Sequence, residues 1–536
     1  VKLACDYLNA GMADTMLTGA VSAGDPLFIN QGFSIFTAYS ENDISCPLDK
    51  RTEGLVSGEG AGMLLLKRYD DAIRDQDTIY AVISTIGLSN DGKGRSVLSP
   101  YKSGQLLAYE RAYKNTAIRP DQVDYVECHA TGTHLGDLTE LESLEDFFGK
   151  HQTAPLVGAV KANFGHLLTC AGMASMLKVI LSLRQSEIPA TIHVEQPASS
   201  PKGLIAGDQI VTEPTPWPKK SEGRFGAVNA FGFGGTNAHL VFEEPGFVAA
   251  SNQPPALSIP PVSIVGMDAC FGNLEDLASF EHAVFAGQPA FKAIPENRWK
   301  GIDKERSLLS TYGLDADSLP EGAYLESIKL DALRYKIPPN ELDQMMPQQM
   351  VMLKVADKAV QDAGLKEGSN VGVIVAMEAD KSLHQFRGRI DLDWLTDKAF
   401  EHAAVELQGI NRDELKSVLK DAIRKPVQVN EFTSFIGNIT ASRISALWNF
   451  TGPAFTVSAD DLSVFKALQI AQMLLATNEV DAIVVGGVDL AGHAEDILLR
   501  HQVDQLNIEE KNKHHWKPGE RSEEHTSELQ SLLIIS

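Results

Sequence analysis

The first half of the chain alternates short apolar runs with longer stretches in which apolar residues recur every three or four positions. The apolar runs predict strands at 16–21 (MLTGAV), 61–67 (AGMLLLK), 124–130 (DYVECHA) and 155–161 (PLVGAVK). The longer stretches predict helices over 103–117 and 172–185. This alternation indicates an α/β fold in which helices pack on sheets.

A proline-rich stretch divides this region from a second one of the same kind. Residues 245–261 (PGFVAASNQPPALSIPP) contain five prolines together with Ser, Asn and Gln, a composition typical of a linker. After it, 261–272 predicts a buried strand and 274–287 a helix. Further on, 340–364 predicts a single long helix and 370–377 another buried strand.

The two regions share an internal repeat. Residues 1–21 (VKLACDYLNAGMADTMLTGAV) align with 468–488 (LQIAQMLLATNEVDAIVVGGV) at a constant offset of 467, so that Gly19 meets Gly486. Each copy predicts an amphipathic helix, a short loop and a buried strand. The repeat indicates that the chain holds the late part of one domain and the early part of a homologous one.

Composition and charge exclude several classes of protein. The chain has 536 residues, enough for two or more domains, and a formal net charge of −24, which disfavours binding to nucleic acid or to anionic membranes. Its five cysteines are scattered without a CxxC pair, as in a reduced cytoplasmic protein without disulfides or a zinc site. No run of eighteen apolar residues predicts a membrane span, and no signal peptide is evident.

Both ends of the sequence are unusual. It lacks an initiator methionine and opens inside a predicted helix, so we expect the first domain to be truncated. Residues 521–531 (RSEEHTSELQS) resemble the in-frame translation of a short-read sequencing adapter. We therefore expect 521–536 to be an artefact and to take no part in the fold.

Three segments of the first region carry residues suited to catalysis. In 127–140 (ECHATGTHLGDLTE), an apolar strand delivers His129 into a loop of small residues. In 161–172 (KANFGHLLTCAG), His166 follows a glycine and precedes a helix, and a helix N-terminus lowers the pKa of a histidine. In 229–239 (NAFGFGGTNAH), three glycines let backbone N–H groups approach a ligand closely, as an oxyanion hole requires.

Together and in this order, the three segments resemble the β-ketoacyl synthase branch of the thiolase superfamily. The two histidines are 37 residues apart, Lys161 lies five positions before His166, and 47–62 (PLDKRTEGLVSGEGAG) fits an internal pattern of that family. Thiolases differ, because they pair one such histidine with a second cysteine. The resemblance implies a thiolase-like layered α/β/α/β/α fold in two homologous copies, both incomplete.

The resemblance also sets domain boundaries. We expect the C-terminal part of a synthase domain (1–245), a linker (246–261), the N-terminal part of a second, chain-length-factor-like synthase domain (262–520) and the adapter-derived artefact (521–536).

The second copy resembles the family around its nucleophile. Residues 437–468 match the segment that leads into a D-T-A-C-S-S-S turn, and the position of the cysteine falls on Asp461. The offset of 467 then puts the nucleophile of the first copy seven residues before Val1. We expect that the first copy has lost its cysteine by truncation and that the second has replaced it with an aspartate, a poor acyl acceptor.

The resemblance implies a role for each candidate residue. His129 and His166 would hold the thioester oxygen of the malonyl substrate, with His129 assisting decarboxylation, and Lys161 with Glu140 would orient the His166 region. A second group of residues matches positions that contact phosphopantetheine, gate the site, shape the oxyanion hole or support the loop: Thr131, Thr133, Phe233, Gly234 and Asp137.

Simpler roles compete with some of these. Packing explains Thr131, Thr133 and Phe233 equally well, and carboxyl groups such as Asp137 and Glu140 can simply satisfy buried polar groups. The remaining histidines of this region are expected to be structural or on the surface: His134, His151, His193 and His239.

The function implied is elongation of acyl chains on an acyl carrier protein by decarboxylative condensation with malonyl carrier protein. No bound cofactor and no metal is expected, since substrates arrive on the carrier's phosphopantetheine. Partners are the carrier protein and other synthase domains, and the two copies are expected to form a pseudo-dimer. The tandem order resembles the large subunit of bacterial polyunsaturated fatty acid synthases.

Two alternatives stay open. One is a scaffold in which both copies only shape a chain-length tunnel, and the other is a fragment of a modular polyketide synthase. A cysteine before Val1 distinguishes an enzyme from the scaffold, and a downstream acyltransferase would indicate polyketide assembly. In either case the chain as given is not expected to condense substrates.

Overall fold

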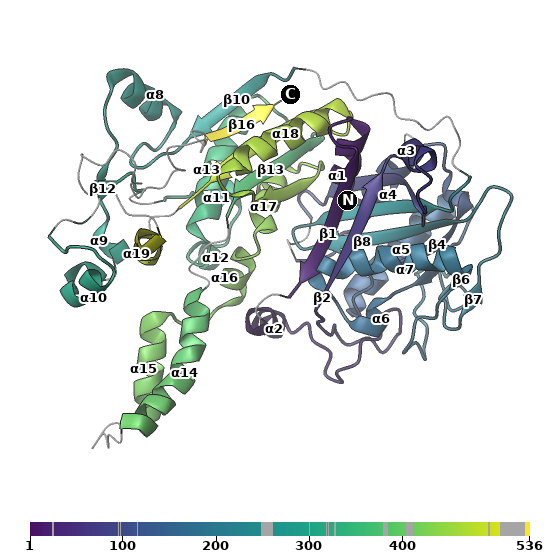
Figure 1. Cartoon of the computed structure of the whole chain (residues 1–536), viewed down its shortest axis with the longest axis horizontal. Coiled ribbons are helices and arrows are strands. Elements are labelled where there is room, and N and C mark those ends of the chain that lie inside the picture. Colours follow the sequence, from purple (N-terminus) through teal and green to yellow (C-terminus); the bar gives the residue numbers. More distant parts are fainter. Residues whose placement is uncertain are drawn as a thin grey trace.

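The computed structural model describes residues 1–23, 26–94, 96, 98–114, 116–247, 261–299, 301–317, 319, 321–325, 328–378, 384–403, 411–490, 494–503 and 531–535. Each of the two predicted regions contains a five-stranded sheet covered by helices (Figure 1). The mixed α/β fold expected from the sequence is confirmed. Most of the predicted linker, residues 248–260, lies outside the described residues.

The sheet of the first region is part antiparallel and part parallel. Its strand order is β3 (Val82–Asn90), β9 (Thr236–Glu243), β8 (Phe225–Gly232), β4 (Val123–Glu127) and β5 (Leu156–Gly158). β3, β9 and β8 pair antiparallel, whereas β8, β4 and β5 run parallel. Parallel strands end at one edge of a sheet, so the segments that follow β8, β4 and β5 meet there.

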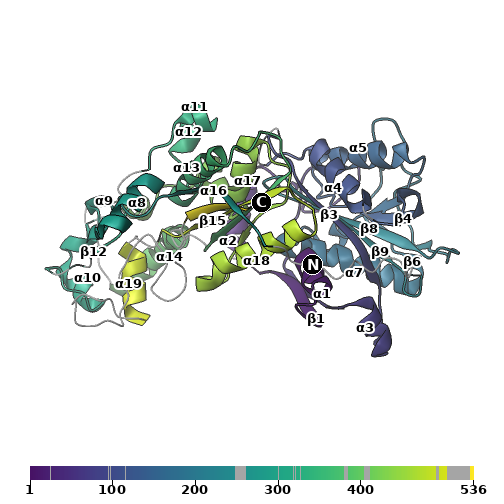
Figure 2. The same cartoon turned by 90° about the horizontal axis from the view of Figure 1, so that it is seen from above.

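Helices cover both faces of this sheet. α4 (Lys102–Lys114) and α5 (His134–Lys150) pack on one face and α7 (Ala171–Gln185) on the other (Figures 1 and 2). Neighbouring strand residues point to opposite faces, as Val126 and Tyr125 do, and belong to separate hydrophobic clusters. Strands buried on both faces explain why the sequence reads as continuous apolar runs rather than alternating ones.

The second sheet is organised in the same way. Its strand order is β10 (Ile264–Ala269), β16 (Ser531–Ile535), β15 (Ala482–Val488), β13 (Val371–Met377) and β14 (Ala454–Val457). α13 (Pro347–Asp362) and α17 (Asn438–Trp448) cover one face, and α18 (Ser463–Ala476) covers the other.

The strand β16 departs from the sequence-based expectation that 521–536 stays outside the fold. Ser531–Ile535 lies antiparallel between β10 and β15. The segment reads SLLII, and β-branched residues such as its two isoleucines are enriched in strands. Residues 521–530 lie outside the described residues.

The internal repeat appears as the same unit in both regions. α1 (Lys2–Asn9) and β1 (Thr15–Ser22) correspond to the second half of α18 and to β15. The homologous helices also touch, since the Tyr7 hydroxyl donates to Gln469 Oε1 at 2.6 Å. β1 differs from β15 in its pairing, because it forms a two-stranded sheet with β2 (Gly60–Lys67).

One predicted helix is interrupted. The stretch 340–364 contains two helices, α12 (Pro339–Leu342) and α13, rather than one. Pro347 is the first residue of α13, where its missing N–H group costs nothing. The same proline disfavours helical backbone at Met346, which is extended, and this ends the preceding helix.

The remaining helices and strands complete the chain. They are α2 (Pro26–Ile35), α3 (Tyr69–Arg74), α6 (Lys161–Phe164), β6 (Glu187–Ile188), β7 (Thr215–Pro216), α8 (Leu277–Ala286), β11 (Lys292–Ala293), α9 (Glu296–Trp299), α10 (Arg306–Thr311), β12 (Glu321–Gly322), α11 (Ala332–Tyr335), α14 (His384–Ala403), α15 (Arg412–Ile423), α16 (Val429–Ser434) and α19 (Ala494–Val503). Within the described ranges, no helix is long and apolar enough to cross a membrane.

Candidate functional site

Two predicted catalytic residues meet at the edge where the parallel strands of the first sheet end. His129 follows β4, and His166 follows the short helix α6 that β5 leads into. Their rings lie edge to face, with centroids 5.5 Å apart, and the ring of Phe231 at the end of β8 lies 5.6 Å from His129. Residues 37 positions apart in the sequence thus form one pair.

A backbone hydrogen bond fixes the tautomer of His166. The N–H group of Leu168 donates to His166 Nδ1 at 3.1 Å, so Nδ1 is the acceptor and the ring proton of the neutral imidazole is on Nε2. Burial and the charge of Lys161 lower the pKa of His166 to about 3. A lowered pKa was expected from the sequence, but burial and a neighbouring cation, rather than the helix, are its cause.

The second histidine is also neutral and is held through its backbone. Burial, with contributions from Lys161 and His166, lowers the pKa of His129 well below its ordinary value. The Glu140 carboxylate accepts the N–H groups of His129 and Ala130, each at 2.8 Å. Glu140 on α5 therefore positions the loop that carries the imidazole.

A chain of buried side chains supports Glu140. The amide of Asn229 donates to Glu140 Oε1 at 2.7 Å, and Asn229 Oδ1 contacts His239 Nδ1 at 2.6 Å. The Tyr113 hydroxyl reaches the other ring nitrogen of His239 at 3.0 Å. His239 is fully buried, and burial lowers its pKa to about 3.

This network was not predicted from the sequence. The buried position of His239 agrees with the structural role expected for it, whereas no role was expected for Asn229. The sequence could have predicted this contact. The glycine-rich turn in 229–239 sets the register of the hairpin, and in that register Asn229 on β8 lies directly opposite His239 on β9.

Asp137 fixes the other side of the His129 loop. Its carboxylate accepts backbone N–H groups from Thr131 at 2.9 Å, Gly132 at 3.2 Å and Leu48 at 2.9 Å. Burial raises the pKa of Asp137 to about 7 against the effect of these three donors. The hydroxyl groups of Thr131 and Thr133 lie 3.0 Å apart. Both threonines therefore lie in the same loop as His129, close to each other.

Lys161 supplies the positive charge of the site. It is only 2% exposed, and burial lowers its pKa, against the opposing charges of Glu127 and Glu140. The Ser45 hydroxyl donates to the Lys161 carbonyl at 2.7 Å and anchors its backbone. The charge of Lys161 contributes to the lowered pKa of both His129 and His166.

The glycine-rich loop joins β8 to β9. Gly234 and Gly235 have φ angles of +84° and +72°, in the left-handed region that favours glycine. The Gly235 N–H donates to the Gly232 carbonyl at 3.1 Å and closes the turn. Phe233, the first residue of this loop, is 38% exposed. No acceptor among the described residues bonds the N–H groups of Phe233 and Gly234, so both can receive a ligand oxygen.

Four of the five cysteines do not offer an activated thiol. Burial raises the pKa of Cys5 to about 11 and also raises the pKa of Cys46, Cys128 and Cys270, whereas a nucleophile needs a lowered value. Cys170 is buried. Asp461 lies in a short 3₁₀ helix, Asp460–Leu462, between β14 and α18, and its side chain lies outside what the structure describes.

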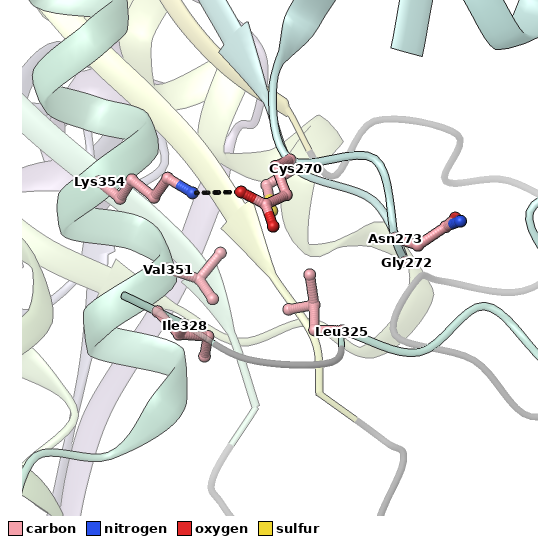
Figure 3. Close-up of a pocket in the computed structure, with 8 residues that line it drawn as sticks. Cys270, Gly272, Asn273, Leu325, Ile328, Val351 and Lys354 are labelled. Carbon is pink, nitrogen blue, oxygen red and sulfur yellow. Dashed lines mark ion pairs between the residues drawn. The ribbon is translucent and has the colours of Figure 1, made fainter. Parts of the chain in front are cut away.

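Two cavities lie away from the histidine pair. One of about 30 Å³ in the second region has room for a single water; its lining includes Cys270 and Lys354, which pairs with Glu275 at 3.8 Å (Figure 3). The other, about 220 Å³, lies between the regions, and Gly234 and Ser442 contribute to its wall. In the described ranges, no cluster of His, Cys, Asp and Glu is arranged to hold a metal ion.

Comparison with known proteins places these features in a family context. The description "Beta-ketoacyl synthase, N-terminal domain" matches residues 1–72 and 260–515, more than half of the chain. The description of the C-terminal domain of the same synthases matches 80–195, and that of a ketoacyl-synthetase C-terminal extension matches 202–276.

Individual relatives agree with these matches. A polyunsaturated fatty acid synthase subunit of Thraustochytrium sp. is 37% identical over 516 residues, which is 93% of this chain and 24% of that protein. A phenolphthiocerol/phthiocerol polyketide synthase subunit of Mycobacterium tuberculosis is 36% identical over 46% of this chain and 16% of its own length. The chain therefore spans a small part of both.

A solved structure matches along the whole chain. The PfaC keto synthase–chain length factor superposes with a TM-score of 0.92 and 45% sequence identity, covering 100% of this chain and 56% of the solved one.

Proposed function

Because the chain belongs to the β-ketoacyl synthase family, we propose that it is part of a synthase that elongates acyl chains on an acyl carrier protein by decarboxylative condensation with malonyl carrier protein. The likeness to a polyunsaturated fatty acid synthase subunit and to a keto synthase–chain length factor supports this substrate class. The proposal assigns the histidine pair to the first copy and a chain-length role to the second.

The observation that carries the proposal is the neutral histidine pair. When the malonyl group loses CO2, the electrons of the broken C–C bond move into the thioester and leave a negative charge on its oxygen. Neutral imidazoles can donate N–H bonds to that oxygen, and the Leu168 N–H leaves Nε2 of His166 as the donor. The low pKa of both rings keeps them in this state at neutral pH.

The second half of the reaction forms the new C–C bond. The enolate carbon attacks the carbonyl of an acyl group held as a thioester on a cysteine, and the thiolate leaves. The raised pKa of four of the cysteines argues against any of them as this nucleophile.

The substrates reach the site on a carrier rather than as free molecules. Thr131 and Thr133 border the His129 loop and are proposed to contact the phosphopantetheine arm, with Phe233 as a gate. Asp461 in place of a cysteine supports a second copy that carries no acyl group. We propose that the two copies act as a pseudo-dimer in the cytoplasm, without a bound cofactor.

The proposal can be tested in the synthase polypeptide that contains this chain. The His129→Ala and His166→Ala variants are each expected to lower the condensation rate by about two to three orders of magnitude, the cost of one oxyanion donor. His151→Ala serves as the control, because His151 is exposed at the end of α5. The assay follows CO2 release and acyl-chain extension from malonyl carrier protein.

The outcomes separate the candidate functions. Loss of both signals in the two histidine variants, with His151→Ala unchanged, supports the condensing enzyme. A wild-type synthase that binds acyl carrier protein but releases no CO2 would show a scaffold instead.

A further inference from the structure

The loop Phe233–Gly235 is held from two directions. Asn90 Nδ2 donates to the Gly234 carbonyl at 3.0 Å, and the Asp91 N–H donates to the Gly235 carbonyl at 2.9 Å. Both donors belong to the first region. The Phe233 carbonyl has a different donor: it accepts from Asn438 Nδ2 at 3.2 Å, at the first residue of α17 in the second region.

Asn438 contacts the base of the same loop. Its Nδ2 donates to Thr236 Oγ1 at 3.1 Å, and the Thr236 hydroxyl donates in turn to the Ala454 carbonyl on β14, also at 3.1 Å. Nδ2 lies 3.3 Å from Ser442 Oγ, one turn along α17. The second region therefore fixes both the Phe233 carbonyl and the first residue of β9.

Close packing leaves the loop little freedom to move at this contact. A Cβ atom at Gly234 would come within 2.2 Å of Ser442 Oγ, so the bare backbone of this glycine lies against α17. Phe36 links the two sides, since its ring lies 6.1 Å from that of Phe233 and 5.5 Å from that of Phe432 on α16.

The hydrogen bond from Asn438 also determines where the Gly234 N–H group points. A peptide bond is planar and trans, so the C=O of one residue and the N–H of the next point in opposite directions. Holding the Phe233 carbonyl therefore sets the direction of the Gly234 N–H, one of the two loop N–H groups free to receive a ligand oxygen. The same strand, β8, carries Asn229 and Phe231 toward His129.

From these contacts we infer that Asn438 is a positioning residue for the condensing site, and that the copy without a nucleophile holds the Phe233–Gly235 loop of the other copy in its working conformation through this amide. The inference rests on the proposed function for the role of the loop in condensation. It gives the second copy a direct part in the chemistry of the first, besides any effect on chain length.

The test compares three variants in the synthase polypeptide that contains this chain. Asn438→Ala removes the amide, and Asn438→Asp keeps its shape but replaces the donor with a carboxylate that repels the Phe233 carbonyl. Asn370→Ala is the matched control, because Asn370 accepts from Arg111 across the same interface at 2.6 Å but does not touch the loop. Thermal melting verifies that all three variants fold.

Two readouts are needed. Amide hydrogen exchange across residues 230–238 is expected to rise about five- to tenfold in both Asn438 variants, the effect of losing one hydrogen bond. The kcat of condensation is expected to fall about tenfold in Asn438→Ala and further in Asn438→Asp, with the KM for carrier protein within about twofold. Asn370→Ala should match the wild type in both.

Several results would overturn the inference. One is an unchanged kcat in both Asn438 variants, whether or not amide hydrogen exchange of the loop rises. Another is an equal loss of kcat in Asn370→Ala, which would show a general effect of the interface. A wild-type synthase that does not condense contradicts the proposed function instead. In that case, the exchange rates still decide whether Asn438 holds the loop, since they need no turnover.

Discussion

The backbone N–H of Leu168 donates to Nδ1 of His166 at 3.1 Å, and this one bond decides which nitrogen of the imidazole faces a substrate as a donor. The same ring is buried beside Lys161, which keeps it uncharged at neutral pH. A histidine in this state works as a fixed dipole rather than as an acid or base that must change charge.

A first prediction concerns the pH profile of condensation. With a pKa of about 3, His166 stays neutral from pH 8 down to pH 5.5, so its protonation should not lower the rate in that range. A histidine with an ordinary pKa of about 6.5 would be mostly charged at pH 5.5, and the rate would fall about tenfold. Initial rates of CO2 release against pH, compared with the melting temperature at each pH, distinguish the two cases.

A second prediction concerns the carboxylate that holds the His129 loop. Glu140→Gln places an NH2 group opposite a backbone N–H donor, and we expect it to lower the free energy of unfolding by about 1–3 kcal/mol. The condensation rate should fall about ten- to hundredfold as His129 shifts. Glu142→Gln is the control, since Glu142 pairs with Lys102 at the surface of the same helix and should change stability by less than about 1 kcal/mol.

Equal behaviour of the Glu140 and Glu142 variants in chemical denaturation and in the rate assay would contradict this role for Glu140.

Much of the site could be predicted from the sequence because its parts are local. His129 and His166 each lie next to a strand or helix whose apolar pattern is clear, and their spacing carries the resemblance to the family. The register of the β8–β9 hairpin could have predicted that Asn229 lies opposite His239, but this pairing was not predicted. The contact of Asn438 with the Phe233–Gly235 loop could not be predicted from the sequence, because only tertiary packing brings α17 to a loop about 200 residues earlier.

The pairing of strands was likewise hard to predict from the sequence. The apolar runs located β4 and β5 of the first sheet and β10, β13 and β15 of the second, but β3, β8, β9 and β14 were not predicted. Strand partners depend on contacts between distant segments. The sequence repeat made β1 and β15 equivalent, yet β1 forms a two-stranded sheet with β2, whereas β15 lies between β13 and β16. The Pro347 break was missed because a helical apolar pattern continues across it.

A third prediction tests the tight contact at Gly234. Gly234→Ala puts a side chain on a backbone with φ of +84° and within 2.2 Å of Ser442 Oγ, so we expect a loss of about 1–3 kcal/mol in stability and a lower condensation rate. Adding Ser442→Gly should restore part of the rate by removing the clash, although the backbone strain stays.

Gly207→Ala is the matched control, because its Cβ would meet only the Pro197 ring at an ordinary 3.6 Å and its φ is not in the left-handed region. If Gly234→Ala were as stable and as active as Gly207→Ala, the loop would not be confined as described.

A fourth prediction concerns Asp91, whose carboxyl group accepts from Asn237 Nδ2 at 2.8 Å beside the same loop. Burial raises its pKa from 3.8 to about 7. The folded state then keeps a proton that the unfolded state has lost, so the contribution of Asp91 to stability falls as pH rises from about 4 to 7 and is constant above that.

Asp91→Asn removes this titration. Relative to the variant, the wild type should lose on the order of 2–4 kcal/mol of unfolding free energy between pH 4 and pH 7. Urea denaturation of both proteins at several pH values measures the difference, and a difference that does not vary with pH would show that Asp91 ionises normally in the folded protein.

Nitrogen NMR of the protein with ¹⁵N-labelled histidine tests most directly whether the two histidines are neutral hydrogen-bond donors. His166→Gln, which removes one set of signals, assigns the resonances. At pH 7, His166 is expected to carry its proton on Nε2 with Nδ1 unprotonated, and neither ring nitrogen should titrate between pH 8 and pH 5. A midpoint between pH 6 and pH 7, or a proton on Nδ1, would contradict this expectation.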